Sequence, residues 1–302
     1  MEDSINLAID QSLQAESGTW YRNLQVLGRG GNAATFLVVA TSGQNRGVPF
    51  AVKIFRRLSK PERRDNFLQE MKFLETCSHP SVLRIFDTGV FYGEHPFLIA
   101  EYLPRTLYQI IRADNSSITQ KISFATQLLS ALAYLNVLAK PVIHRDIKPQ
   151  NILIKGNSCV LGDFGLMKWA DADTVEDQAF LKESLGVGMP GRYRTPDQVA
   201  YLKGESPLTT GSDIFQLGLV LAELFTGRNP EKPSAEFTDA VELEPLSWVR
   251  GGLGGMIANV INQMLQIDPP ARPNAVQLLN AWEGIFREAV ARSHALEGRA
   301  MQ

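Results

Sequence analysis

Two short stretches near the middle of the chain carry side chains that could act together on a phosphate. The first, His144 to Asn151, contains a carboxylate at Asp146, a cation at Lys148 and an amide at Asn151. The second contains another carboxylate, Asp163, followed by Phe164-Gly165. Phosphoryl transfer needs a carboxylate to orient the attacking hydroxyl, ligands for a metal ion, and positive charge near the transferred group. We therefore expect these stretches to form a phosphoryl-transfer site.

The order and spacing of these residues match the H-R-D-x-x-x-x-N and D-F-G motifs of protein kinases at every specified position. The chain thus resembles the eukaryotic-type (Hanks-type) serine/threonine protein kinases over roughly residues 20–290. The resemblance implies an α+β, bilobal fold. It places a β-rich lobe with one main helix at 20–101, a hinge at 102–105 and a larger helical lobe at 106–290. Residues 1–19 would form a short helix on the domain or a frayed extension, and 291–302 a C-terminal tail.

The resemblance also assigns a role to each polar residue of the two stretches. Asp146 would accept or orient the proton of a substrate hydroxyl, and Lys148 would screen charge on the γ-phosphate. Asn151 and Asp163 would hold Mg²⁺, for which oxygen ligands are suitable. Leu153 would lie under the adenine. ATP and Mg²⁺ are the implied cofactors, protein serine or threonine is the implied substrate, and the chain is expected to be an enzyme.

A glycine-rich turn is expected between two strands near the N-terminus. Gly28 and Gly30 would let backbone N–H groups approach phosphates closely. The pattern departs from that of the family, because Ala33 stands where a third glycine is usual and Thr35 where a valine is usual. A G-x-G alone is a weak signal, so this assignment depends on the motifs that follow.

Lys53 interrupts an apolar run that matches the kinase strand motif V-A-I-K. Residues 61–77 read as a helix whose apolar face is formed by Phe67 and Leu74, and Glu70 lies on that face. A carboxylate on an apolar face needs a partner, and Lys53 is the natural one. The alternative is a helix phase that leaves Glu70 in solvent. The family resemblance adds contacts to the adenine from Ala51, Ala100, Glu101 and Leu103.

The segment from Leu166 to Gly191 is polar and contains glycines, so we expect it to be mobile. In the family, the arginine at the position of Arg145 often binds a phosphate carried by this segment. Thr174 and Ser184 are the candidate acceptors. Alternatively, a carboxylate supplies the charge permanently, from Asp171, Asp173, Glu176 or Asp177.

Three residues further along the chain bear on this assignment. Met189 stands where serine/threonine kinases have a threonine, which weakens the prediction of substrate type. Asp197 can still pair with Arg272, as the equivalent residues do in the family. Asp213 would bind backbone amides of the catalytic loop, cap its own helix, or both.

Two other functions stay open. A pseudokinase scaffold is disfavoured because the polar residues of the site are all present, and a kinase of small molecules is disfavoured because Arg145 and Lys148 occur together. A peptide substrate and a catalytic role are therefore preferred.

Composition excludes several classes of protein. The chain has 302 residues, 44% of them hydrophobic, and a formal net charge of −2, which argues against a dominant nucleic-acid surface. Cys77 and Cys159 are far apart and are expected to be free thiols. We find no apolar stretch long enough to span a bilayer and no secretory signal, so we expect a cytoplasmic protein with no membrane span. The oligomeric state is left open.

Overall fold

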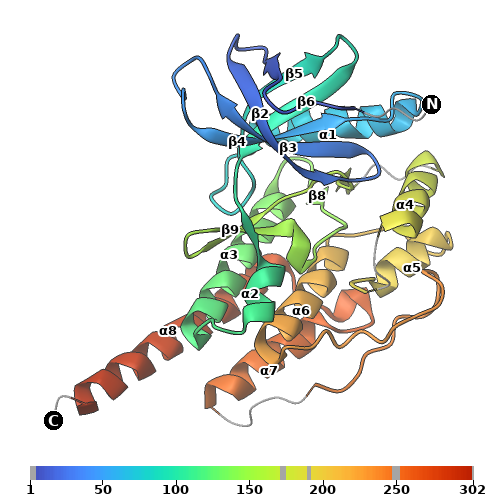
Figure 1. Cartoon of the computed structure of the whole chain (residues 1–302). Helices are drawn as coiled ribbons and strands as arrows, with labels where there is room; N and C mark the ends of the chain where they lie inside the picture. Colours follow the sequence, from blue (N-terminus) through green and yellow to red (C-terminus); the bar gives the residue numbers. More distant parts are fainter. Residues whose placement is uncertain (1–4, 171–174, 189–191, 247–251, 301–302) are drawn as a thin grey trace. The chain divides into compact units, whose positions relative to one another are not determined.

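The structure is a computed structural model that describes residues 5–170, 175–188, 192–246 and 252–300, with the backbone alone over 186–188 and 293–300. The chain divides into two compact units, Met1–Pro104 and Arg105–Gln302. Strands dominate the first unit and helices dominate the second (Figure 1). The expected α+β class is therefore confirmed. The division at Pro104 falls inside the predicted hinge.

The first unit is built on one antiparallel sheet with strand order β1-β2-β3-β4-β6-β5. Residues with branched or aromatic side chains are frequent in these strands, as is usual where a pleated surface is half buried. The strands are β1 (Ser12–Gln14), β2 (Trp20–Arg29), β3 (Ala33–Ala40), β4 (Pro49–Phe55), β5 (Ile85–Phe91) and β6 (His95–Glu101).

The register of this sheet separates a core face from a second face. Side chains alternate between faces along each strand, and Phe36, Val52 and Ile99 lie in one row of the core face. Thr35 pairs with Lys53, and Ala51 pairs with Ala100, on the opposite face. The strand pattern thus gathers four of the residues predicted to contact the nucleotide, Thr35, Ala51, Lys53 and Ala100, on a single face.

Helix α1 (Pro61–Thr76) covers part of this second face. Proline at its first position suits a helix start because the missing N–H has no partner there in any case. Its buried side includes Phe67, Glu70 and Leu74, and the Phe67 ring lies 5.5 Å from that of Phe55 on β4. The predicted helix phase is confirmed.

The N-terminal segment is neither a helix nor a frayed end over its described part. Strand β1 pairs with β2, and Ile5, Leu7 and Leu13 are buried in the core of the sheet. Asn23, itself buried, donates from its side-chain amide to the carbonyl oxygen of Leu7 at 2.8 Å. This segment therefore completes the hydrophobic core of the first unit.

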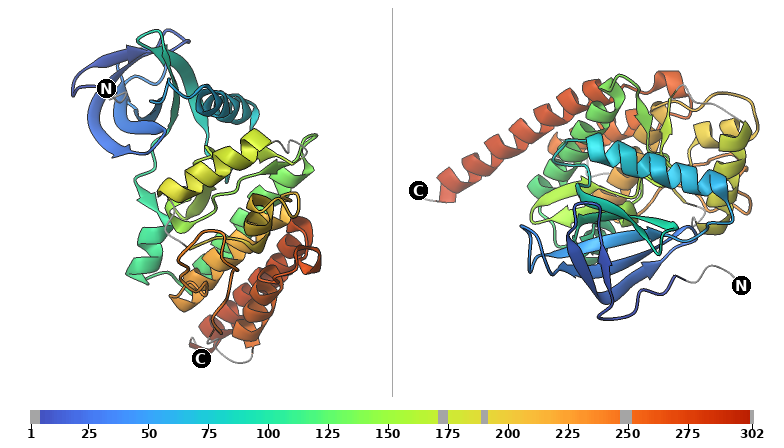
Figure 2. Two further views of the ribbon diagram at one scale, coloured as in Figure 1. Left: turned by 90° about the vertical axis from the view of Figure 1, so that its right-hand side faces the viewer. Right: turned by 90° about the horizontal axis from the view of Figure 1, so that it is seen from above.

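The second unit consists mainly of helices, with two small pieces of sheet. Helix α3 packs against α6 and α8, and α7 packs against both α6 and α8 (Figures 1 and 2). The helices are α2 (Leu107–Ala113), α3 (Ile118–Val137), α4 (Val175–Gly188), α5 (Pro196–Leu202), α6 (Gly211–Thr226), α7 (Gly252–Met264) and α8 (Ala275–Ala300), with short 3₁₀ turns η1 (Pro149–Asn151) and η2 (Pro269–Ala271). The strands are β7 (Arg105–Thr106), β8 (Val142–Ile143), β9 (Ile152–Lys155), β10 (Ser158–Leu161) and β11 (Lys168–Trp169).

Two segments of this unit differ from the sequence prediction. The stretch expected to be mobile contains α4, which buries Leu181 and Leu185 in a cluster with Ile143, Tyr201 and Leu208. Residues 291–300 of the predicted tail belong to α8, which Figure 2 shows as one uninterrupted helix. Polar composition concealed the apolar side of α4.

No helix within the described residues is both long enough and apolar enough to cross a bilayer. Cys77 and Cys159 are free thiols, as predicted.

Candidate active site

The predicted ion pair between Lys53 and Glu70 is confirmed. Lys53 Nζ lies 2.7 Å from Glu70 Oε1 and 3.0 Å from Oε2. The Glu70 side chain is 2% exposed, and that of Lys53 is 21% exposed. A buried carboxylate needs such a partner, whereas the lysine keeps part of its surface open. Lys53 can therefore be held by α1 and still meet a ligand on the second face of the sheet.

The glycine-rich turn links β2 to β3 and is tied to the segment that precedes α1. The backbone N–H of Arg56 donates to the carbonyl of Asn32 at 2.8 Å, and the Arg56 guanidinium donates to the carbonyl of Gly30 at 3.2 Å. Arg63, buried on α1, donates to the side-chain oxygen of Asn32. The turn is thereby fixed at its tip.

Glycine at two positions of this turn is not required by the protein's own packing. A Cβ added to Gly28 or Gly31 would meet no atom within 4 Å, and neither residue has a positive φ. Bare backbone at such places allows a ligand to approach the N–H groups closely. This arrangement fits a phosphate-binding turn. Ala33 is 8% exposed, so its apolar methyl group is buried.

The residues of the first unit predicted to contact adenine lie on β4, on β6 and just after β6, and Leu153 lies on β9 of the second unit. Ala51 and Ala100 face each other across the two strands, and Ala100 is 3% exposed. The backbone N–H of Glu101 donates to the carbonyl oxygen of Arg84 at 3.1 Å. Leu103 is half-buried. Because Ala51 and Ala100 have small side chains, they leave space above this part of the sheet, which a flat aromatic ring needs.

The catalytic loop of the second unit follows β8. Lys148 Nζ lies 3.0 Å from Asp146 Oδ2, and Asn151 Nδ2 donates to the same oxygen at 2.7 Å. Asp146 Oδ1 is buried and has no hydrogen-bond partner. A buried polar atom without a partner calls for an explanation, and a catalytic role is one explanation. Of the two oxygens of Asp146, Oδ1 is therefore the one that no protein group binds.

Burial raises the pKa of Asp146 to about 6. The nearby Lys148 cation opposes this rise, and the Asp163 carboxylate adds to it. A carboxyl with such a pKa is a better proton acceptor than an ordinary aspartate.

Asp163 and Asn151 are brought together by the backbone. Gly162 donates its N–H to the carbonyl of Asn151 at 2.9 Å, and its own carbonyl contacts His144 Nε2 at 3.0 Å. The ring of His144 also contacts that of Phe164, at 4.6 Å between centroids. The Asn151 amide oxygen and the Asp163 carboxylate are the ligands that Mg²⁺ accepts, beside phosphate oxygens and water. The donor set thus fits the implied metal.

The second unit contains both supporting contacts expected from the sequence. Asp213, buried at the start of α6, accepts from the backbone N–H groups of His144 at 2.7 Å and Arg145 at 2.9 Å. Burial raises the pKa of Asp213 to about 7. Asp197 Oδ2 lies 2.7 Å from Arg272 Nη1, and both side chains are buried. The shorter aspartate at 197 therefore still reaches the arginine.

Arg145 is buried and binds a carboxylate of the segment after Phe164. Its Nη1 donates to both oxygens of Asp177, at 2.9 and 2.7 Å. Lys168 Nζ lies 3.7 Å from Asp177 Oδ2, and the Tyr201 hydroxyl donates to the same carboxylate oxygen at 2.8 Å. Burial lowers the pKa of Lys168, and the Asp177 charge opposes that change. A carboxylate of α4 thus occupies the cationic site for which the sequence offered either a phosphate or an acidic residue.

Of the two candidate phosphate acceptors, the structure describes only Ser184. Ser184 lies on α4 with its hydroxyl oxygen buried and without a hydrogen-bond partner. Thr174, Asp171, Asp173 and Met189 lie outside the described residues. Glu176, next to Asp177, is exposed.

Several residues that support the site were not identified from the sequence. Gln198 and Gln216 bind the backbone of the catalytic loop, and Lys168 joins the contacts around Asp177. For Lys168 a signal existed, because it is a lone lysine between hydrophobic neighbours, as is Lys53. For the glutamines no sequence signal distinguished them from ordinary helix residues.

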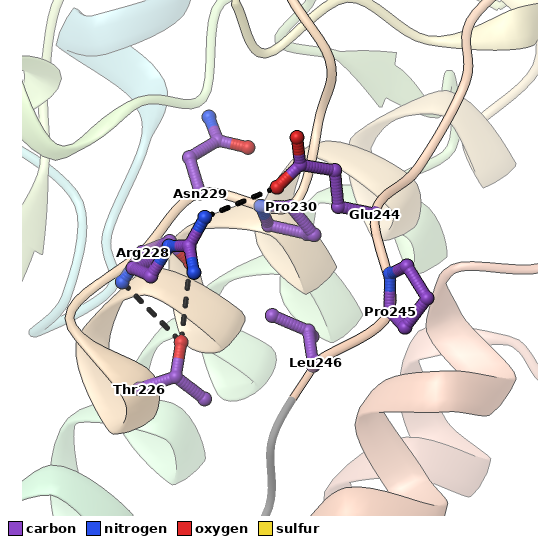
Figure 3. A pocket seen from close by; sticks show the side chains of 7 residues that line it. All are labelled: Thr226, Arg228, Asn229, Pro230, Glu244, Pro245 and Leu246. Atoms are coloured by element: carbon purple, nitrogen blue, oxygen red, sulfur yellow. Dashed lines mark hydrogen bonds and ion pairs between the residues drawn. The ribbon is translucent and has the colours of Figure 1, made fainter.

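A small pocket lies elsewhere in the second unit, beyond the end of α6. Thr226, Arg228, Pro230 and Leu246 are among its lining residues, and Arg228 pairs with Glu244 at 3.1 Å (Figure 3). Its lining includes no residue predicted to act in phosphoryl transfer. The ion pair is exposed, so it contributes little stability.

Comparison with known proteins agrees with this geometry. The model of the family described as "Protein kinase domain" matches residues 21–282. A Drosophila melanogaster protein named as mitogen-activated protein kinase kinase kinase 7-like is 28% identical over 263 residues, 80% of this chain and 63% of its own length. A Dictyostelium discoideum protein named as a serine/threonine-protein kinase is 30% identical over 269 residues, 85% of this chain and 15% of its own length.

A serine/threonine-protein kinase-like protein of Arabidopsis thaliana is 30% identical over 229 residues, which are 73% of this chain and 59% of that protein. The chain therefore spans less than two thirds of the length of each of these curated relatives. The family match, by contrast, covers most of this chain, from the second strand to the last helix. The motifs, the sheet and helices of the two units and this match together show that the chain belongs to the protein kinase domain family.

Proposed function

We propose that the protein transfers the γ-phosphate of ATP to serine or threonine hydroxyls of protein substrates in a Mg²⁺-dependent reaction. The observation that carries this proposal is the buried, partnerless oxygen of Asp146 beside Lys148 and Asn151. A carboxylate with a cation and an amide beside it is the set of groups that phosphoryl transfer needs. The curated relatives that are named as serine/threonine kinases support the choice of substrate.

Each unit would supply a different part of the chemistry. In the first, Lys53 would bind the α- and β-phosphates, the turn at Gly28 and Gly30 would cover the phosphates, and the strand residues around Ala51 would contact the adenine. In the second, Asp146 would take up the proton of the attacking hydroxyl, and Lys148 would stabilise charge on the transferred group. Mg²⁺, when bound, neutralises phosphate charge. Asn151 and Asp163 would hold it, and Leu153 on β9 would contact the adenine.

We also infer that the protein needs no phosphate on the segment before α5. Asp177 already makes two charge-assisted bonds to Arg145, which is the contact that a phosphate would make. The buried hydroxyl of Ser184 supports the same inference, because a modifying enzyme would have to displace α4 to reach it. A cytoplasmic location stays a prediction that cell fractionation would test.

The experiment compares the wild-type protein with Asp163→Ala in an autophosphorylation assay with Mg-ATP. We expect label on the wild type and at least about a hundredfold less on the variant, because a metal ligand is lost. Equal labelling of the two would contradict the proposal. A wild type that takes up no label and yet binds partners would favour a pseudokinase scaffold.

A peptide array then separates the remaining alternative. A protein kinase labels peptides with a sequence preference, and we expect labelled serine and threonine. A kinase of small molecules would leave the array unlabelled while consuming ATP in a metabolite extract.

A further inference from the structure

Gln216, on α6, is a fully buried side chain whose polar atoms all bind backbone groups of other segments. Its Oε1 accepts from the N–H of Ile147 at 2.9 Å, and its Nε2 donates to the carbonyls of Arg145 at 3.2 Å and Tyr193 at 2.9 Å. The orientation of the amide is unambiguous, because a flipped amide would point N–H at N–H and oxygen at oxygen.

The two contacts in the catalytic loop lie on either side of Asp146. The carbonyl of Arg145 belongs to the peptide group before Asp146, and the N–H of Ile147 belongs to the one after it. Both peptide groups are therefore held by a single side chain. Arg145 has a φ of +68°, a conformation that a residue with a side chain keeps only when its surroundings enforce it.

A second glutamine reinforces one of these contacts. Gln198 on α5 donates to the carbonyl of Arg145 at 2.8 Å, and it is fixed by Thr195, whose hydroxyl accepts from the N–H of Gln198 at 2.9 Å. Thr195 in turn contacts the Ser212 hydroxyl on α6 at 2.8 Å. Gln198 also accepts from the backbone N–H of Thr195 at 3.2 Å. Of the two glutamines, only Gln216 binds the backbone of Tyr193 and the peptide groups on both sides of Asp146.

We propose that Gln216 is a positioning residue that sets the orientation of Asp146 and couples it to the segment at Tyr193. This inference rests on the proposed function, since Asp146 is the residue it positions. A displacement of about 1 Å at a reacting group is enough to lower a rate about a hundredfold. The effect of Gln216 should accordingly fall on turnover and leave nucleotide binding unchanged.

Two substitutions test this proposal. Gln216→Glu keeps the length and the acceptor for Ile147 but replaces both donors by an oxygen that faces two carbonyls. Gln216→Met keeps the size and removes every hydrogen bond without adding charge. For each we expect kcat on a peptide to fall at least tenfold, the Kd for Mg-ATP to stay within twofold, and hydrogen exchange over 144–148 to quicken.

The matched control is Gln127→Glu. Gln127 lies on α3 in the same unit, and its Oε1 accepts from the N–H of Cys159 at 2.6 Å, so the same type of bond and the same change of charge are tested away from the loop. We expect a kcat like that of the wild type per folded molecule. Melting curves of all the variants report the folded fraction.

Folded Gln216 variants with wild-type turnover and exchange would overturn the inference. If both variants fail to fold, the wild type decides. Its Ile147 N–H must exchange as slowly as the core amides of α6, and fast exchange would contradict a fixed loop. Absence of phosphate transfer by the wild type would count against the proposed function, whereas the exchange experiment reports on positioning independently.

Discussion

Asp146 and Arg145 are adjacent in sequence but are held by separate sets of contacts. One oxygen of Asp146 binds Lys148 and Asn151, and the other stays buried without a partner. The guanidinium of Arg145 instead binds Asp177. In the proposed reaction the first set would prepare a proton acceptor, and the second anchors the loop that carries it.

The contact between Arg145 and Asp177 predicts the behaviour of Asp177→Asn. The variant leaves two buried cations, Arg145 and Lys168, without their carboxylate. Because a buried charge that loses its partner is costly, we expect the free energy of unfolding to fall by about 3 kcal/mol, together with a loss of activity. Chemical denaturation and a kinase assay measure the two effects.

Glu176→Gln is the control for this variant, since Glu176 is the exposed neighbour on the same helix and should tolerate the change. Mass spectrometry completes the test, and the active wild type should carry no phosphate on Thr174 or Ser184. An inactive wild type that gains activity when either residue is phosphorylated would refute the role given to Asp177.

Sequence reasoning reached those residues that a motif or an unusual environment marks. Lys53 interrupts an apolar strand and Glu70 an apolar helix face, so each predicts the other. The contacts of Gln216 could not be predicted in this way, because an uncharged amide on a helix becomes informative only when the segments around it are in place. The choice between a phosphate and Asp177 likewise needed the helix that carries Asp177.

At the scale of elements, α1 acts on two parts of the first unit through one face. Arg63 binds Asn32 in the glycine-rich turn, and Glu70, two turns later, binds Lys53. Phe67 packs on Phe55 between them. A single helix therefore sets both the turn and the lysine.

Removal of the first contact should loosen the turn and spare the ion pair. For Arg63→Gln we expect the KM for ATP to rise at least about tenfold, which corresponds to the loss of one charge-assisted hydrogen bond, while kcat changes less than twofold. Steady-state kinetics at varied ATP concentration measures both quantities. Arg64→Gln, at an exposed position of the same helix, should behave like the wild type. An unchanged KM in Arg63→Gln would show that Asn32 needs no partner.

Elements were predictable where their periodicity was strong. The helix at 61–77 and the strands on either side of the glycine-rich turn were identified from alternation and spacing. Helix α4 was not, because acidic residues and a glycine hide the apolar residues Leu181 and Leu185, which become buried only in contact with Tyr201 and Leu208. The strand at Ser12–Gln14 is too short to show a recognisable alternation in the sequence, and it is stabilised by pairing with β2.

At the scale of the whole molecule, the chain consists of two units with separate cores, each of which organises its own part of the chemistry. The first holds Lys53 and the glycine-rich turn, and the second holds Asp146, Asn151 and Asp163. The motifs predicted the family and the α+β class, because the spacing of functional residues is tied to that fold. The burial of the segment before residue 20 could not be predicted, since a segment that only completes a core carries no motif.

The most direct test of this account follows the γ-phosphate of ATP to its acceptor. Wild-type protein and Asp146→Asn are incubated with labelled Mg-ATP and a mixed peptide pool, and the labelled amino acids are identified while nucleotide binding is measured in parallel. We predict label on serine and threonine from the wild type, transfer by Asp146→Asn slower by about 10²–10⁴-fold, and similar affinity of both for Mg-ATP. A wild type that neither binds nor transfers at millimolar Mg-ATP, or an Asp146→Asn variant as fast as the wild type, would contradict the account.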